Sequence, residues 1–226
     1  MKKASTLRIP FTWEERRPVF LDRCLYIPSH YDLHDRWEKL PWADPSFFGN
    51  SNPVVIEYCS GNGQWIVERA KENPEINWIA VEKKFDRSEK IWKKIHKEEL
   101  PNLYVVCGDA RTFSKYYALE KSISKIFVNF PDPWPKLRHA KHRLLQVDFF
   151  QLLEKQMVKG ARAFINTDDF PYVNRILSDI LPLSNWKSLL PSPYFATDLP
   201  DYGRSYFYDL WKSKGRNIYS LQFEVQ

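Results

Sequence analysis

Three acidic side chains stand near the ends of predicted strands, where polar ligands bind in α/β proteins. Glu57 lies near the end of one short apolar run, Glu82 follows the next run, and Asp109 follows the third. Because the carboxyl ends of parallel strands meet at one edge of a sheet, we expect these acids to face one crevice. Carboxylates repel a polyphosphate but accept hydrogen bonds from ribose hydroxyls and amino groups. The set therefore favours an uncharged or cationic nucleoside ligand.

A glycine turn follows the first of these strands. The chain holds only 7 glycines among 226 residues, so Gly61 and Gly63 are expected where a side chain would obstruct something. Glu82 lies about 20 residues beyond Gly61, the separation at which an acid binds ribose hydroxyls in nucleotide-binding folds. Trp65 and Ile66 occupy the region where a dinucleotide-binding loop has its third glycine, which disfavours a dinucleotide. A tight turn without a ligand is the alternative.

The most specific motif is Phe130-Pro131-Asp132-Pro133-Trp134-Pro135-Lys136. Two prolines fix the backbone around Asp132, so the motif predicts a stiff loop that presents a catalytic or base-holding carboxylate. Trp134 offers a flat face for a nucleobase, or alternatively plugs the core. A compact basic cluster follows: Lys136, Arg138, His139, Lys141, His142 and Arg143. Basic groups beside an aromatic side chain favour contact with nucleic acid.

The elements that must position these residues alternate along the chain. Apolar runs predict strands at Val54–Cys59, Trp78–Val81, Leu103–Cys107, Lys125–Phe130, Ala161–Asn166 and Ile218–Val225. Amphipathic stretches predict helices at Gln64–Lys71, Phe85–Glu98, Leu144–Lys159 and Tyr172–Leu181. This alternation is typical of an α/β fold with a mostly parallel central sheet flanked by helices. Residues 1–52, rich in proline, are expected to form an irregular N-terminal arm, and residues 53–226 one domain.

Composition excludes several classes of protein. The chain has 34 Lys and Arg against 28 Asp and Glu, a net charge of +6, which is compatible with a polyanionic partner. Its three cysteines show no C-x-x-C pairing, so we expect free thiols in the cytoplasm and no metal. No apolar run is long enough to span a membrane, and no signal peptide or obligate protein partner is expected.

The stretch from Val54 to Asp169 resembles the bacterial tRNA (guanine-N7)-methyltransferases, which methylate guanine 46 in the tRNA variable loop. The resemblance rests mainly on the Phe130–Lys136 motif with its basic cluster, and on Thr167-Asp168 after the fifth strand. It implies a Rossmann-like class I methyltransferase fold, S-adenosylmethionine as methyl donor, and tRNA as substrate.

The resemblance also implies roles for particular residues. Glu57, Glu82, Asp109 and Asp132 match the family's cofactor-site acids, and Asp132 is also its proposed catalytic residue. Lys136 and Asp168 match positions that contact the substrate. The glycine turn adds Gly61 to the expected cofactor-binding residues.

Two positions depart from the family pattern. Cys59 stands where the family usually has glycine, which is expected to narrow the methionine side of the cofactor pocket. Near the C-terminus the family's Thr-x-Phe-Glu motif is replaced by Ser205-Tyr206-Phe207-Tyr208, so an acid that helps hold the target nucleotide is missing. Asp209, one residue later, is a hypothetical substitute.

Guanine N7 carries a lone pair and no proton, so its methylation requires alignment more than a general base. We expect Asp132 to stabilise the positive charge that develops on the purine or to hold the guanine edge, and Trp134 to offer a π-face. Two alternatives remain open at this point. One is a methyltransferase that acts on an exocyclic amino group of DNA or RNA, although such enzymes place two adjacent prolines after the acid. The other is a catalytically silent RNA-binding module on the same fold.

Overall fold

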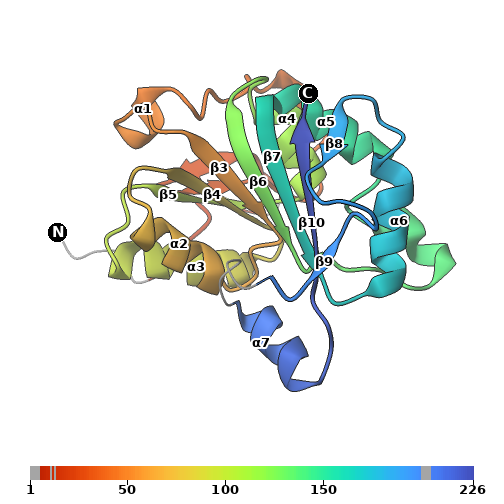
Figure 1. The fold of residues 1–226 in the computed structure, drawn as a ribbon. Coiled ribbons are helices and arrows are strands. Elements are labelled where there is room, and N and C mark those ends of the chain that lie inside the picture. Colours follow the sequence, from red (N-terminus) through yellow and green to blue (C-terminus); the bar gives the residue numbers. More distant parts are fainter. Residues whose placement is uncertain (1–5, 11, 13, 200–204) are drawn as a thin grey trace. The chain divides into compact units, whose positions relative to one another are not determined.

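The computed structural model describes residues 6–10, 12, 14–199 and 205–226 (Figure 1). Its chain forms two compact units, Met1–Leu119 and Glu120–Gln226, which we describe one at a time. The boundary predicted between residues 52 and 53 falls inside the first unit. Lys2 and Lys3, which belong to the predicted N-terminal arm, lie outside the described residues.

The first unit is built on five strands in the order β1-β2-β5-β4-β3. Their bounds are β1 Val19–Leu21, β2 Cys24–Tyr26, β3 Val54–Tyr58, β4 Asn77–Glu82 and β5 Leu103–Cys107. Pairing is parallel from β2 through β5 and β4 to β3, whereas β1 is antiparallel to β2. The parallel register places Glu57 beside Ala80 and Glu82 beside Cys107. The carboxyl ends of these strands therefore share one edge, as the sequence predicts.

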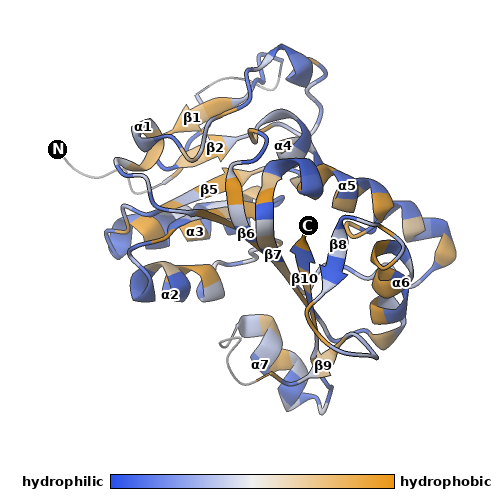
Figure 2. Cartoon of the chain, turned by 45° about the horizontal axis from the view of Figure 1, so that its top comes forward, coloured by the Kyte–Doolittle hydropathy of each residue, from blue (hydrophilic) through white to orange (hydrophobic). Residues whose placement is uncertain are grey.

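Helices cover the strands of the first unit. Their bounds are α1 Pro45–Phe48, α2 Gln64–Glu72, α3 Phe85–Lys97 and α4 Ala110–Tyr116, with a 3-10 turn at His34–Arg36. α2 and α3 lie side by side and pack on β4 and β5 (Figure 1). Buried Ile91, Trp92 and Ile95 form the inner face of α3. Figure 2 shows the hydrophobic colour along β2 and β5, and mixed colours on α2 and α3, as amphipathic helices require.

The N-terminal segment is more ordered than predicted. β2 pairs with β5, and the fully buried Trp42 donates its indole N–H to the Tyr117 carbonyl at 2.9 Å. The prediction of a wholly irregular arm over 1–52 is wrong in this respect. Three-residue strands are too short to show a period, and frequent prolines masked them in the sequence.

The described part of the second unit also contains five strands. Their bounds are β6 Ile123–Asn129, β7 Met157–Thr167, β8 Trp186–Ser188, β9 Ala196–Thr197 and β10 Tyr219–Val225. β6 and β7 are parallel, whereas β10 runs antiparallel to β7, β8 and β9. The helical elements are a 3-10 helix at Leu137–His142 and helices α5 Val147–Gln156, α6 Phe170–Ile180 and α7 Tyr206–Ser213. The parallel strands β2, β5, β4 and β3 of the first unit and the parallel pair β6–β7 of the second confirm the predicted α/β class.

The predicted strands and helices are present, with shifted ends. The helix predicted over Leu144–Lys159 stops at Gln156, because Met157 pairs with Ile123 and already belongs to β7. The helices α4 and α7 were not predicted, since each is at most eight residues long, which is too short for a helical pattern to be recognised in the sequence. No helix in the described parts of the chain is long and apolar enough to cross a membrane.

Candidate active site

The glycine turn connects β3 to α2 in a left-handed conformation. Gly61 and Gly63 have φ angles of 55° and 70°, and the Gly63 N–H donates to the Ser60 carbonyl at 2.8 Å. A Cβ built at Gly63 would lie 2.6 Å from Cγ1 of Ile91 on α3. Gly63 therefore serves the packing of α3, whereas the buried Gly61 donates its N–H to the Glu82 carboxylate.

Replacing Gly63 by Ala is expected to cost about 2–4 kcal/mol of unfolding free energy, since left-handed strain and overlap with Ile91 add up. Gly49→Ala is the matched control. Gly49 also has a positive φ, of 75°, but a Cβ there meets nothing within 4 Å, so only about 1 kcal/mol should be lost. Urea unfolding of both variants measures the difference. Equal losses would contradict the packing role of Gly63.

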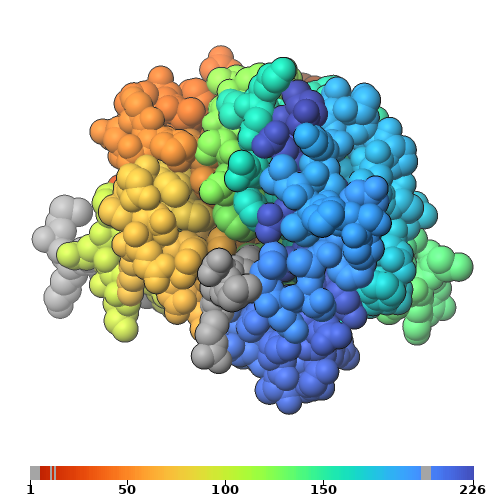
Figure 3. All heavy atoms as spheres, in the orientation of Figure 1, coloured from red at the N-terminus to blue at the C-terminus, as the bar shows by residue number. Residues whose placement is uncertain are grey.

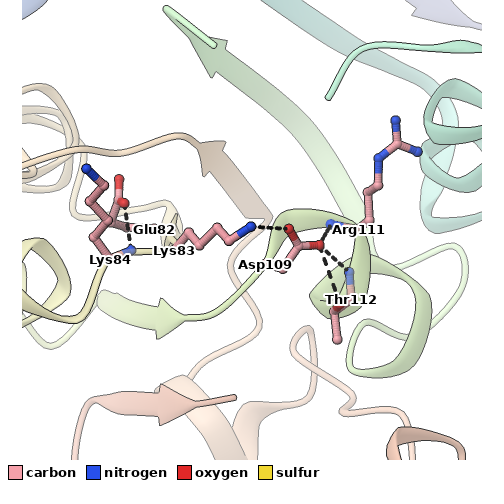
Figure 4. A network of polar contacts seen from close by, with 6 residues as sticks. All are labelled: Glu82, Lys83, Lys84, Asp109, Arg111 and Thr112. Atoms are coloured by element: carbon pink, nitrogen blue, oxygen red, sulfur yellow. Dashed lines mark hydrogen bonds and ion pairs between the residues drawn. The ribbon is translucent and has the colours of Figure 1, made fainter. Parts of the chain in front are cut away.

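Glu82 holds the glycine turn with its carboxylate. Oε2 accepts from the Gly61 N–H at 2.8 Å. Oε1 accepts from the Lys84 N–H at 2.9 Å (Figure 4). The residue is buried, and this burial raises the pKa of the Glu82 carboxyl, while three backbone N–H groups and the charge of Arg87 act in the opposite direction. A carboxylate has about four lone-pair positions, so the group can still accept a further donor.

Asp109 has two tasks at the end of β5. Its Oδ1 accepts from the N–H groups of Arg111 and Thr112 at 3.0 and 3.1 Å, which caps α4. Its Oδ2 lies 3.5 Å from Nζ of Lys83, which is exposed (Figure 4). Because an exposed ion pair is weak, Oδ2 is the oxygen that remains available to a ligand.

Glu57 and Cys59 flank the end of β3. Glu57 is almost fully buried, and its carbonyl accepts from Oγ of Ser60 at 2.9 Å. Cys59 has a φ of 63°, a conformation that is strained for any residue with a Cβ. Glycine adopts a positive φ without this strain, which explains why the family that the sequence resembles usually has glycine at this position.

The Phe130–Lys136 loop follows β6 and is bent at two strained positions. Phe130 and Trp134 have φ angles of 49° and 43°. Arg143 fastens the loop, because its Nε donates to the Pro133 carbonyl at 2.8 Å and its Nη2 to the Trp134 carbonyl at 2.9 Å. Asp132 lies exposed on this fastened segment. Arg143, expected in a phosphate-binding cluster, thus has a structural task.

Arg143→Met is expected to lower the unfolding free energy by about 2–3 kcal/mol, because two charge-assisted hydrogen bonds to a strained loop are lost. Arg138→Met, at an exposed neighbour in the same basic cluster, should stay within about 0.5 kcal/mol of the parent protein. Urea unfolding measures both changes. If the two variants were equally stable, Arg143 would not fasten the loop.

Trp134 lies at the surface with 36% of its area exposed, so it does not plug the core. His139 and His142 approach its ring with centroid distances of 5.6 and 5.3 Å. Lys136 is exposed at the end of the loop. The loop therefore offers one aromatic face, one carboxylate and one ammonium group to solvent.

Asp168 comes directly after β7. Because β7 is parallel to β6, Asp168 lies at the same sheet edge as the Phe130–Lys136 loop, which comes directly after β6. Its carboxylate forms an ion pair with Arg216, and Asp169 beside it caps α6 through a 2.8 Å hydrogen bond from the Tyr172 N–H. The Phe130 N–H donates to the Asn166 carbonyl at 2.8 Å. This bond and the strand pairing bring Asp132 and Asp168 to one edge of the second unit.

Buried amides at this edge were not predicted. Nδ2 of Asn166 donates to Oδ1 of Asn129 at 3.2 Å, and Oγ of Ser220 donates to Oδ1 of Asn166 at 2.6 Å. These bonds tie β6, β7 and β10 together just before the Asp132 loop. In the sequence, these amides could have been found as polar residues at the ends of otherwise apolar strands. Among the described residues, no three His, Cys, Asp or Glu side chains gather as metal ligands.

The chain is similar to known proteins over most of its length. A family described as "Putative methyltransferase" matches residues 51–221. A tRNA (guanine-N(7)-)-methyltransferase of Chlamydia caviae is 44% identical over 224 residues, covering 98% of this chain and 97% of the relative. The Listeria innocua protein of the same name is 32% identical over 203 residues, 88% of this chain and 89% of the relative. The chain belongs to the tRNA (guanine-N(7)-)-methyltransferase family.

Membership of the tRNA (guanine-N(7)-)-methyltransferase family makes the chain a methyltransferase, as the motifs predict. Solved structures confirm the class I methyltransferase fold. The 16S rRNA methyltransferase KamB aligns with a TM-score of 0.62 at 16% identity, over 80% of this chain and 91% of that one. A 30S ribosomal A1408 methyltransferase from an uncultured bacterium aligns with a TM-score of 0.56 at 16% identity, over the same shares.

This member of the tRNA (guanine-N(7)-)-methyltransferase family uses its altered C-terminal motif to begin α7. Oγ of Ser205 accepts from the Tyr208 N–H at 3.1 Å, which is a helix cap. Phe207 lies on α7 with its ring centroid 6.1 Å from that of Phe130, at the start of the Asp132 loop. The altered motif therefore still packs beside the candidate site.

Proposed function

We propose that the protein transfers a methyl group from S-adenosylmethionine to N7 of guanine 46 in the tRNA variable loop, in the cytoplasm. The observation that carries this proposal is the full-length similarity to proteins named tRNA (guanine-N(7)-)-methyltransferase. The surface basic groups Lys136, Arg138 and Lys141 around the aromatic Trp134 support a nucleic-acid substrate.

The residues at the strand ends of the first unit suit S-adenosylmethionine. Glu82 is held in place by backbone N–H groups and keeps acceptor capacity for ribose hydroxyls, and Gly61 forms the turn beside it. We assign the adenine amino group to Oδ2 of Asp109 and the cationic methionine end to the buried acid Glu57. When bound, the cofactor supplies a methyl group activated by a sulfonium centre.

The second unit supplies the groups proposed for guanine. Because N7 carries a lone pair and no proton, the residues must align the base and stabilise charge, and no general base is needed. As the N7–carbon bond forms and the carbon–sulfur bond breaks, positive charge passes to the purine. We assign stabilisation of this charge to Asp132, the base-stacking face to Trp134, and contacts with the substrate to Lys136 and Asp168.

The proposal is tested with three tRNAs and labelled S-adenosylmethionine. A transcript with guanine at position 46 should accept one methyl group, and the same transcript with adenine there should accept none. A third tRNA carries 7-deazaguanosine at position 46, where a C–H group replaces N7, and it too should accept none. Methylation of the 7-deaza substrate would indicate an exocyclic amino target. Tight binding of tRNA and cofactor without any transfer would indicate a silent binding module.

A further inference from the structure

The end of α7 folds back in a way that fixes the position of Arg216. The Gly215 N–H donates to the Lys212 carbonyl at 2.9 Å, and the Arg216 N–H donates to the Trp211 carbonyl at 3.0 Å. Gly215 has a φ of 72°. These two bonds and the left-handed glycine define a Schellman motif, which brings the second residue after the helix cap over the last turn. Arg216 is therefore held by backbone bonds.

The Arg216 side chain lies between an aromatic ring and an acid. Its guanidinium carbon is 4.3 Å from the ring centroid of Trp211, and Nη1 pairs with Oδ2 of Asp168. Asp168 has only 12% of its side chain exposed, whereas Arg216 has 52%. A stacked guanidinium loses less freedom when it binds a carboxylate than a mobile one does. The ion pair thus joins two fixed side chains.

A second acid anchors the same segment. Oδ2 of Asp198 pairs with Nζ of Lys212 at 3.0 Å, and its Oδ1 accepts from the Ile218 N–H at 3.2 Å. These bonds hold the residues on both sides of Arg216. No residue of α7 is buried, and Figure 3 shows the helix, in blue, at the surface of the molecule. The anchoring therefore does not come from burial in a core.

We propose that Arg216 is a positioning residue that orients Asp168 toward the target guanine, an inference that rests on the proposed function. With Oδ2 of Asp168 bound to Arg216, Oδ1 is directed to the N–H donors of the guanine Watson–Crick edge. Adenine presents an acceptor at N1, which the carboxylate would repel. The Trp211–Arg216–Asp168 arrangement is thus a specificity device built from α7 and the end of β7.

A double-mutant cycle tests this inference through methyl transfer to tRNA. Arg216→Met should raise KM for tRNA about tenfold, because one charge-assisted bond that orients Asp168 is lost, and should leave kcat within about twofold. The affinity for S-adenosylmethionine should not change. Arg216→Lys should recover most of the loss. In an Asp168→Asn background, Arg216→Met should have almost no further effect on KM.

Lys214→Met is the matched control, because Nζ of Lys214 lies 4.8 Å from the centroid of the same Trp211 ring. Its KM for tRNA should stay within about twofold of the parent value.

If the effects of Asp168→Asn and Arg216→Met multiply, Arg216 contacts RNA directly and the inference is wrong. An unchanged KM in Arg216→Met, or a loss confined to kcat, would also overturn it. Absence of N7 methylation by the parent protein would instead refute the proposed function. Should Arg216→Met melt below the assay temperature, Arg216→Gln carries the same prediction.

Discussion

Replacing Asp132 by Asn is expected to lower kcat for methyl transfer about 100- to 1,000-fold, the range seen when a group that stabilises transition-state charge is removed. Asn keeps the size and hydrogen-bonding reach of the side chain but cannot balance the positive charge that develops on guanine. Because Asp132 is exposed, the unfolding free energy should change by less than about 0.5 kcal/mol. Single-turnover methylation with saturating tRNA measures the effect.

Asp148→Asn is the control for charge alone, since Asp148 is an exposed acid of the same unit at the start of α5. It should methylate at the parent rate. The affinities of Asp132→Asn for tRNA and S-adenosylmethionine need to be measured as well, so that weak binding is not mistaken for slow chemistry. A parent-like kcat in Asp132→Asn would remove Asp132 from the mechanism.

Replacing Glu82 by Gln is expected to weaken S-adenosylmethionine binding about 10- to 100-fold, the loss of one charge-assisted hydrogen bond. Gln presents one oxygen instead of two, so the N–H of either Gly61 or Lys84 loses its acceptor. Calorimetric titration with the cofactor measures the change. Glu68→Gln, at an exposed position on α2, should bind like the parent protein. Equal affinities in the two variants would contradict a ribose-binding role for Glu82.

Glu82 should also make the stability of the cofactor-free protein depend on pH, and Glu82→Gln should remove this dependence. Burial raises the pKa of Glu82 above its ordinary value of 4.5, so the folded state favours the protonated carboxyl. The stability from this group is fully present below pH 4.5 and is lost as pH rises through the folded pKa. The unfolding free energy of the parent minus that of Glu82→Gln should therefore decrease with rising pH. A difference that grows with pH would contradict the assignment.

Local patterns predicted the elements that carry the acids. Glu57 lies in β3, Glu82 ends β4, and Asp109 follows β5. Apolar residues come directly before each acid or its strand end, and a parallel sheet buried on both faces requires such apolar runs. The Asp132 loop was recognisable because proline restricts the backbone in the chain itself. Features of this kind depend on neighbouring residues, so one sequence is enough to find them.

Contacts between distant residues were not predictable from the same patterns. Arg216 and Asp168 are 48 residues apart, and nothing near either residue indicates the other. Arg143 looked like one more basic residue of a cluster, yet it bonds to backbone carbonyls ten and nine residues earlier. Strand β2 joins β5 only because the N-terminal segment returns to that edge of the first unit. Tertiary packing decides each of these contacts.

The most direct test of the central claim is the identity of the methylated nucleoside. Unmodified tRNA transcript is incubated with the protein and labelled S-adenosylmethionine, digested to nucleosides and separated by chromatography with mass detection. We predict label in 7-methylguanosine, mapped to position 46, and its loss in Asp132→Asn. Label in another nucleoside, or 7-methylguanosine undiminished by Asp132→Asn, would contradict it.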